Sequence, residues 1–376
     1  MPAASAPSIP SLVRARMGTP ARLRLIAEAS WRHGHRLRAV LWLTCGPALY
    51  ALTRICLWLD HLFYPQLAGV RVERPVFIMG HPRSGSTFLQ QQVFRTGRVG
   101  MFRTWELACP SLIQRRLIAP FVRLIGRSGA DVAQGAEQGH QIRINGVEED
   151  EGLFLHRLDT EIVTYLCPWL LTDPRYAEAG MRLGRLTRRE RLRSLEFYRD
   201  VLQRQVLATG LDRLVLKCNP TVFRIRELLT VFPDARIVYL VRSPEACVRS
   251  FQAFTHRFVA PLLSADELRT FHLRKYEWSR ALYRAFEEAR NLVPAGQLLV
   301  ITFSEIVEDL PRTMERFCAF AGIRATTRFR QELRHGPRRR RRARPHHNYP
   351  LNYYDIDPSE VRRDLGAVWE RYGLPE

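Results

Sequence analysis

The segment from Gly80 to Thr87 has the residue types and the spacing to bind a phosphate or sulfate group. It reads G-H-P-R-S-G-S-T, and its glycines and final threonine match the nucleotide-binding pattern G-x-x-x-x-G-K-[ST]. Ser86 replaces the lysine that reaches the β- and γ-phosphates in that pattern, which argues against a kinase or other NTPase. Backbone N–H groups, hydroxyls and the charge of Arg83 remain, and they suit a smaller anionic group at a helix N-terminus.

A second candidate anion site is formed by Arg242 and Ser250. Arg242 follows the apolar run 235–241, and Ser250 comes eight residues later, in a segment where Ser243 and Pro244 indicate the start of a helix. An arginine at the carboxyl end of a strand and a serine on the next helix can both face the ligand-binding edge of a parallel sheet. A guanidinium and a hydroxyl together would bind a phosphate in a fixed geometry.

The elements that must position these residues alternate between strand and helix. Short apolar runs predict buried strands at 75–79, 214–216, 235–241 and 298–302, and amphipathic or capped segments predict helices at 187–207, 222–232 and 304–320. This alternation predicts an α/β fold with a P-loop-like parallel sheet, flanked by helices and connected by right-handed crossovers. Gly80 to Thr87 then connects the first strand to a helix over 88–94.

On these residues the sequence resembles the PAPS-dependent sulfotransferases, particularly the mostly bacterial sulfotransferase-like proteins. P-R-S-G-S-T at 82–87 is similar to that family's 5′-phosphosulfate loop, P-R-S-G-T-T, and 232–250 is similar to its 3′-phosphate segment. The family commonly has Asp where Ser243 stands, and both residues can cap a helix. The resemblance covers roughly residues 70–370. It implies the sulfotransferase fold, PAPS as sulfuryl donor with 3′,5′-ADP as product, no metal, and a donor site that includes Arg83, Ser84, Gly85, Ser86, Thr87, Arg242 and Ser250.

The resemblance also implies the catalytic residues. Glu106, in T-W-E-L, occupies the place of the family's proposed glutamate base, and its apolar neighbours could make it more basic; the alternative is a solvated glutamate at a helix start. His81 is the second candidate base because histidine titrates near neutrality, although a loop histidine can also merely pack. Lys217, at the end of an expected strand, would stabilise the bridging oxygen of the leaving group; a structural ion pair is the alternative.

Two charged runs have less specific interpretations. The four acids at 148–151 lie where an acidic pair borders the acceptor pocket in the resembled family, but a solvated acidic loop or a set of partners for the arginines is as well supported. The run Arg338 to Arg342, with Arg344, has the place in sequence of a basic loop that closes over the 3′-phosphate. We therefore assign residues 336–348 to such a loop, with Arg341 and Arg342 at the phosphate. A solvated or membrane-facing basic patch is the alternative.

The composition is strongly basic. The 376 residues include 58 Lys and Arg against 37 Asp and Glu, a net charge of +21, and the only lysines are Lys217 and Lys275. This charge would also fit a nucleic-acid-binding protein, but no recognised nucleic-acid motif accompanies it, so we expect no nucleic-acid partner. Seven cysteines without a C-x-x-C pair indicate a reduced, cytoplasmic chain without a zinc site or disulfide framework.

The first 70 residues form a basic and apolar helical extension, ahead of a catalytic domain at 71–376. The apolar stretch 39–53 is shorter than the roughly 20 residues of a spanning helix, and Arg54 separates it from a second apolar stretch at 55–64. We expect a pair of helices that lies on the cytoplasmic face of a membrane or covers the domain's own core. The acceptor is a hydroxyl on a lipid, carbohydrate or other small alcohol, and the sequence leaves the oligomeric state open.

Overall fold

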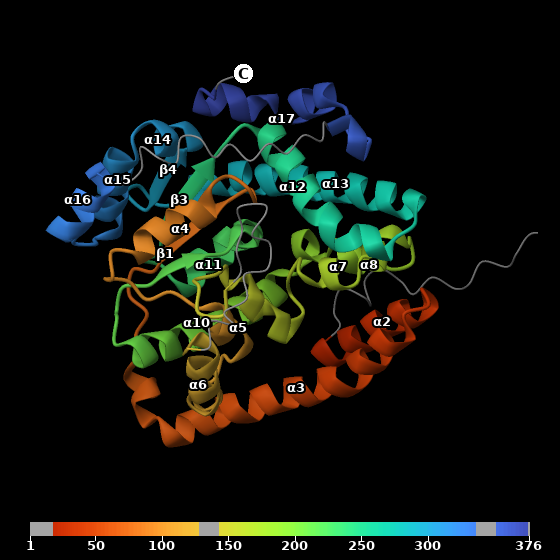
Figure 1. The fold of residues 1–376 in the computed structure, drawn as a ribbon, viewed down its shortest axis with the longest axis horizontal. Coiled ribbons are helices and arrows are strands. Elements are labelled where there is room, and N and C mark those ends of the chain that lie inside the picture. Colours follow the sequence, from red (N-terminus) through yellow and green to blue (C-terminus); the bar gives the residue numbers. More distant parts are fainter. Residues whose placement is uncertain (1–17, 128–142, 336–350, 375–376) are drawn as a thin grey trace, which may run out of the picture.

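A parallel sheet of four strands forms the centre of the computed structural model, which describes residues 18–127, 143–335 and 351–374 (Figure 1). The strand order is β2-β1-β3-β4. The bounds are β1 Val76–Gly80, β2 Val215–Lys217, β3 Arg236–Val241 and β4 Leu298–Thr302. The predicted α/β fold with a parallel sheet is confirmed, and each predicted strand lies within one residue of an observed one.

Successive side chains of each strand point to opposite faces of the sheet, and a hydrophobic core lies on each face. Phe77 and Met79 of β1 point into one core, whereas Val76 and Ile78 point into the other, and all four are fully buried. The second core is completed by α4 (Ser86–Phe94), α15 (Leu310–Ala321) and α16 (Thr327–His335). The first core is completed by α10 (Arg188–Thr209), α11 (Ile225–Val231), α12 (Pro244–Val259), α13 (Ala265–Ala289) and α17 (Pro358–Tyr372). Both faces of the sheet are therefore covered, as expected for buried parallel strands.

Local signals explain where most helices begin and end. The Thr187 hydroxyl accepts a hydrogen bond from the backbone N–H of Glu190 at the start of α10, and Gly210, with φ of 66°, ends that helix. The single helix expected at 304–320 is instead two, α14 (Phe303–Glu308) and α15. The Asp309 side chain caps α15, which explains the break. The other short helices are α5 (Thr104–Ala108), α7 (Val163–Leu166), α8 (Trp169–Thr172) and α9 (Ala177–Gly180).

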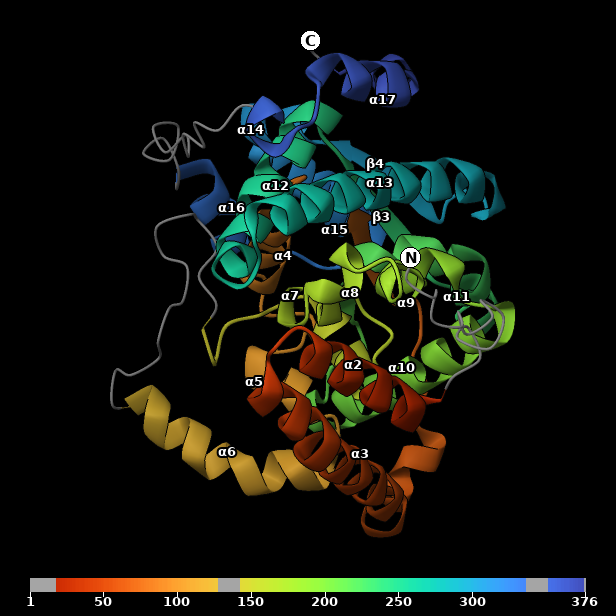
Figure 2. The ribbon, with the colours of Figure 1, turned by 90° about the vertical axis from the view of Figure 1, so that its right-hand side faces the viewer.

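The N-terminal helices α2 (Thr19–Arg32) and α3 (Arg36–Phe63) lie on the opposite side of the molecule from α17, together with α6 (Leu112–Arg127) (Figures 1 and 2). The expected break at Arg54 is wrong, because α3 continues through it for 28 residues with Arg54 exposed to solvent. At Gly46, α2 and α3 approach so closely that a Cβ atom would lie 2.8 Å from the side chain of Leu23. The two helices thus form a tightly packed hairpin.

Candidate active site

The loop between β1 and α4 lies at the centre of the sheet, where its strand order reverses. β1 and β3 are neighbours there, and open α/β sheets bind ligands beyond the carboxyl ends of such strands. Gly85 has φ of 101°, and a Cβ atom at this position would lie 3.0 Å from the ring of Phe303. A Cβ atom on Gly80 would lie 2.5 Å from the carbonyl oxygen of Leu240. The loop therefore requires glycine at both positions.

The loop also presents groups that can donate hydrogen bonds to an anion. The Ser84 hydroxyl is buried, and it has no hydrogen-bond partner among the described residues. No side chain in that part of the chain caps the N-terminus of the nine-residue helix α4, which begins at Ser86. An anionic group at this position would receive hydrogen bonds from both the hydroxyl and the backbone of the first turn.

Arg83, Arg242 and Ser250 come together beside the loop, as predicted from their spacing. Arg83 Nε donates to Ser250 Oγ at 3.1 Å, and Arg242 Nη1 donates to the carbonyl oxygen of Arg83 at 3.1 Å. Arg242 also stacks over Phe303, with its guanidinium carbon 4.3 Å from the ring centroid. Burial, and then the nearby charge of Arg242, lower the pKa of Arg83. The charges of Arg83 and Arg242 thus lie close together and create a positive potential that favours an anionic ligand.

Lys217 reaches the same loop from the end of β2. Its Nζ donates to Thr87 Oγ1 at 2.9 Å and lies 3.1 Å from Glu149 Oε2, while only 2% of the residue is exposed. Burial alone would lower the pKa of Lys217, but the charges of Glu149 and then Glu148 outweigh it, and the pKa is raised. Lys217 is therefore a charged donor beside the loop, and a neighbouring strand supplies the ammonium group that the loop itself lacks.

Glu149 holds Lys217 in this position, a role that the sequence did not reveal. Its Oε1 accepts a hydrogen bond from the backbone N–H of Asn219 at 2.9 Å, while its Oε2 pairs with Lys217. The available signal was the run of four acids in a strongly basic chain. The run does not show which acid pairs with Lys217, because Lys217 lies 68 residues after Glu149 and meets it only in the assembled sheet.

The acids at 148–151 are not a solvated loop, so that alternative is wrong. Asp150 is 1% exposed and accepts a hydrogen bond from the Tyr198 hydroxyl at 2.5 Å. Glu151 is also buried, and it accepts hydrogen bonds from Thr160 Oγ1 at 2.6 Å and from the backbone N–H of Glu161 at 2.8 Å. Burial raises the pKa of both Asp150 and Glu151.

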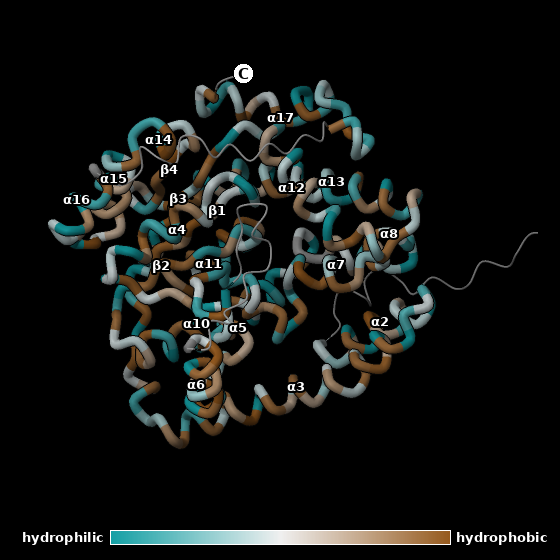
Figure 3. The backbone as a smooth tube through the Cα atoms, viewed as in Figure 1, coloured by the Kyte–Doolittle hydropathy of each residue, from teal (hydrophilic) through white to brown (hydrophobic). Residues whose placement is uncertain are grey.

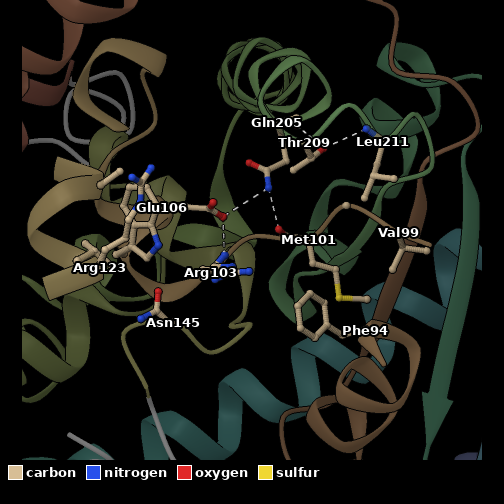
Figure 4. Close-up of a pocket in the computed structure, with 14 residues that line it drawn as sticks. Phe94, Val99, Met101, Arg103, Glu106, Arg123, Asn145, Gln205, Thr209 and Leu211 are labelled. Carbon is tan, nitrogen blue, oxygen red and sulfur yellow. Dashed lines mark hydrogen bonds between the residues drawn. The ribbon is translucent and has the colours of Figure 1, made fainter. Parts of the chain in front are cut away.

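Glu106 lies apart from the donor loop. Its Oε2 accepts hydrogen bonds from the backbone N–H of Arg103 at 2.7 Å and from Gln205 Nε2 at 3.4 Å, so the carboxylate caps α5 (Figure 4). Glu106 lines a cavity of about 330 Å³ with mainly apolar side chains of α4, α6 and neighbouring segments, including Phe94, Val99, Met101, Val122 and Leu211. Glu106 therefore lies at a helix start, as the alternative interpretation has it, and its side chain is half-buried.

A short stretch of backbone connects this cavity to the donor loop. The N–H of Glu148 donates to the carbonyl oxygen of Phe102 at 3.2 Å, and the next residue, Glu149, pairs with Lys217.

His81 is a packing residue, and its assignment as the second candidate base is a prediction that the structure does not support. The residue is 1% exposed, its ring stacks on Tyr283 with centroids 5.1 Å apart, and its Nδ1 bonds to the carbonyl oxygen of Pro82 at 2.6 Å. Burial lowers the pKa of His81 to about 4. The imidazole is enclosed by these contacts, and its Nε2 has no hydrogen-bond partner among the described residues. The other predicted phosphate ligands, Arg341 and Arg342, lie outside the described residues.

The loop after β1 bears glycines and lacks lysine, Arg242 follows β3 with Ser250 on α12, and Lys217 ends β2. Together they define an enzyme that binds a phosphorylated or sulfated donor at the centre of its sheet. A sequence profile described as "Sulfotransferase family" matches residues 75–327. The chain therefore belongs to the sulfotransferase family and is a sulfotransferase enzyme, as the sequence resemblance indicated. Membership of this family implies PAPS as the donor.

The chain is also similar to individual sulfotransferases along most of its length. It is 25% identical over 335 residues to the omega-hydroxy-beta-dihydromenaquinone-9 sulfotransferase Stf3 of Mycobacterium bovis, covering 84% of this chain and 80% of that protein. Its fold matches sulfotransferase STF1 from Mycobacterium tuberculosis with a TM-score of 0.69, at 18% identity over 93% of this chain and 92% of that one. It matches sulfotransferase STF9 from Mycobacterium avium with a TM-score of 0.66, at 16% identity over 96% and 98% of the two chains.

Proposed function

We propose that this sulfotransferase transfers the sulfuryl group of PAPS to a hydroxyl of a lipid-like acceptor. In the proposed reaction the acceptor oxygen forms a bond to sulfur as the bond from sulfur to the bridging oxygen of 3′,5′-ADP breaks. The acceptor proton passes to a carboxylate, and the negative charge that develops on the leaving oxygen is stabilised by the protein. The observation that carries the proposal is the convergence of Arg83, Arg242, Ser250 and Lys217 on one glycine-bearing loop.

The donor-binding residues take roles that follow from their positions. Ser84, Gly85, Ser86 and Thr87 would surround the 5′-phosphosulfate with hydroxyl and backbone N–H donors. Arg242 and Ser250, with Arg83 between them, would bind the 3′-phosphate. Lys217, which already contacts Thr87, would stabilise charge on the leaving oxygen.

We assign the role of base to Glu106, with Glu149 as the competing carboxylate. The family resemblance and the mainly apolar cavity beside it support Glu106, which would need to release its hydrogen bond with Arg103 or share it with the acceptor. The distance of 3.1 Å to Lys217 supports Glu149, but a carboxylate that already pairs with an ammonium is better suited to positioning that ammonium. The two assignments predict different effects of Glu106→Gln and Glu149→Gln on kcat.

Two observations support a lipid-like acceptor. The cavity next to Glu106 has room for part of an apolar molecule with a single polar end. In addition, the Mycobacterium bovis relative carries the name of a sulfotransferase that acts on a hydroxylated menaquinone. Among the broader set of alcohols considered from the sequence, we therefore favour the lipids.

The proposal is tested by calorimetry and by a turnover assay. We expect 3′,5′-ADP to bind the purified protein much more tightly than 5′-ADP, which lacks the 3′-phosphate. With PAPS labelled at the sulfuryl group, we expect label to appear in long-chain or isoprenoid alcohols in preference to sugars. No binding of 3′,5′-ADP would contradict the donor assignment, whereas labelling of sugars alone would contradict only the acceptor assignment.

Replacing Arg242 tests the 3′-phosphate site. Arg242→Ala is expected to raise the Kd for 3′,5′-ADP by about 10- to 100-fold, because hydrogen bonds to charged groups contribute about 1.5–3 kcal/mol. The affinity for 5′-ADP should barely change. Arg249→Ala is the matched control, since Arg249 is an exposed arginine on α12, the helix that follows Arg242. Equal losses for both nucleotides would move Arg242 away from the 3′-phosphate.

A further inference from the structure

α3 presents an apolar face that the described part of the protein leaves uncovered. It is the one described helix long and apolar enough to cross a membrane, and only 17% of its most apolar window is buried. In Figure 3 hydrophobic residues recur along its length. Ten of its large apolar side chains are at least 46% exposed: Leu37, Val40, Leu41, Leu43, Leu49, Leu52, Ile55, Trp58, Leu62 and Phe63. At 100° per residue, most of these lie opposite the buried residues Ala39, Thr53, Leu57 and Asp60.

α6 carries a second exposed apolar face. Leu112 and Val122 are buried on one side of the helix. Four large apolar residues on the other side are at least 40% exposed: Leu117, Ile118, Phe121 and Leu124. A helix that is apolar on its exposed side as well as on its buried side needs a packing partner on each of the two sides.

A buried ion pair fixes the two helices to each other and to the domain. Asp60, near the end of α3, is fully buried, and its Oδ2 accepts hydrogen bonds from Arg204 Nε at 2.7 Å and from the backbone N–H of Leu112 at 3.0 Å. Its Oδ1 accepts hydrogen bonds from Ser111 Oγ at 2.8 Å and from the N–H of Ile113 at 3.0 Å. Asp60 therefore caps α6 while it anchors α3 to α10.

The same contacts decide between a spanning and a surface arrangement of α3. Its first half packs on α2 at Gly46 and Leu23, and its second half is held by Asp60 and Arg204. For α3 to cross a bilayer, both sets of contacts would have to break, and the buried Arg204 would lose the Asp60 carboxylate and keep only that of Asp200. A helix held along one side can instead lie flat, with its other side in the boundary between lipid headgroups and acyl chains.

The charges around the two faces indicate which surface they fit. Arg36 and Arg54 of α3 and Arg116 and Arg123 of α6 are exposed, in a chain of net charge +21. The exposed aromatic rings of Trp58, Phe63 and Phe121 are typical of the headgroup region. Arginines beside an apolar face complement an anionic membrane, whereas a second copy of this chain would bring like charges together.

We infer that the outward faces of α3 and α6 together dock the enzyme on the surface of an anionic lipid bilayer, with α3 lying in the interface and not spanning it. Docking requires neither PAPS nor an acceptor, so the inference stands apart from the proposed reaction. It places the cavity at Glu106, which α6 partly lines through Ala119, Val122 and Arg123, close to the lipid.

The inference is tested by flotation of the purified full chain with vesicles, without any substrate. We expect binding to vesicles of phosphatidylcholine with one quarter phosphatidylglycerol, weaker binding to phosphatidylcholine alone, and release at alkaline pH in carbonate. The pairs Ile55→Glu with Trp58→Glu, and Phe121→Glu with Leu124→Glu, should each lower the bound fraction about tenfold or more, because each places charge in the apolar region. Val307→Glu is the matched control, since Val307 is 56% exposed on α14.

Circular dichroism and 3′,5′-ADP affinity establish that each variant is folded. Absence of flotation by the parent protein, or equal flotation of all variants, would overturn the inference. So would a dimer in solution that the same glutamate pairs dissociate, which would assign the face to a second copy. Protein that remains with the vesicles in carbonate would overturn the interfacial placement of α3. Failure of the parent protein to bind 3′,5′-ADP, with intact flotation, would count against the proposed function alone.

Discussion

Glu106→Gln is expected to lower kcat by about 10²–10⁴-fold, the usual contribution of a general base. The amide is nearly isosteric and its oxygen can still accept the hydrogen bond that the backbone N–H of Arg103 donates to Glu106, so the α5 cap and the fold should persist. The amide cannot take up the acceptor proton, and therefore the loss should appear in the chemical step. Single-turnover measurement of the transfer, with the Kd for 3′,5′-ADP measured beside it, checks this result. The Kd should be almost unchanged.

Glu149→Gln separates the two candidate carboxylates. If Glu149 only positions Lys217, this substitution removes one ion-pair partner and should lower kcat much less than Glu106→Gln does. If Glu149 is the base, Glu149→Gln should cause the larger loss of kcat. Retention of near-parent turnover by Glu106→Gln would transfer the role of base away from Glu106.

Lys217→Met is expected to lower kcat by about 10²–10³-fold, comparable to the loss of a donor that stabilises transition-state charge. The reason is that Lys217 is the charged side chain that contacts Thr87, where the leaving oxygen would lie in the proposed complex. Removing the ammonium alone would leave Glu149 as an uncompensated carboxylate. The double variant Lys217→Met with Glu149→Gln avoids this cost and should be as inactive as the single variant.

The other lysine provides the matched control. Lys275 is also fully buried, and its Nζ donates to Glu161 Oε2 at 2.9 Å and to Thr164 Oγ1 at 2.7 Å. It therefore resembles Lys217 in burial and pairing but does not touch the loop. Lys275→Met should lower the Tm and leave kcat, measured per folded molecule, within about threefold of the parent. If both variants lose stability alike and Lys217→Met retains turnover, Lys217 is only a structural ion pair.

The sheet and the donor loop could be predicted from the sequence because their signals are local. A strand buried on both faces is a continuous apolar run, and each of the four runs is followed by residues that end a strand or cap a helix. The pair Arg242 and Ser250 was also predictable, since eight residues along one strand–helix connection fix their relative position.

Contacts between residues far apart in sequence could not be predicted in the same way. The contact of Lys217 with Thr87 joins residues 130 positions apart, and it exists only because β2 is placed beside β1 in the sheet. Likewise, the burial of His81 results from Tyr283 and Trp278, which belong to a distant helix. α3 continues across Arg54 because this residue lies on the side of the helix that faces away from the domain. Apolar residues before and after an arginine in the sequence do not specify which side of the helix faces the domain.

The burial of both lysines determines how the protein responds to reagents that recognise primary amines. Lys217 is 2% exposed and Lys275 is completely buried, while the remaining basic side chains of the chain, apart from histidine, are arginines. In the folded enzyme an amine-directed label would therefore spare both lysine side chains. A protease specific for lysine would find no accessible bond until the sheet or α13 opens. The bond after Lys217 lies at the end of β2, and the bond after Lys275 lies within α13. The order in which the protease cuts these two bonds would therefore report whether β2 or α13 unfolds first.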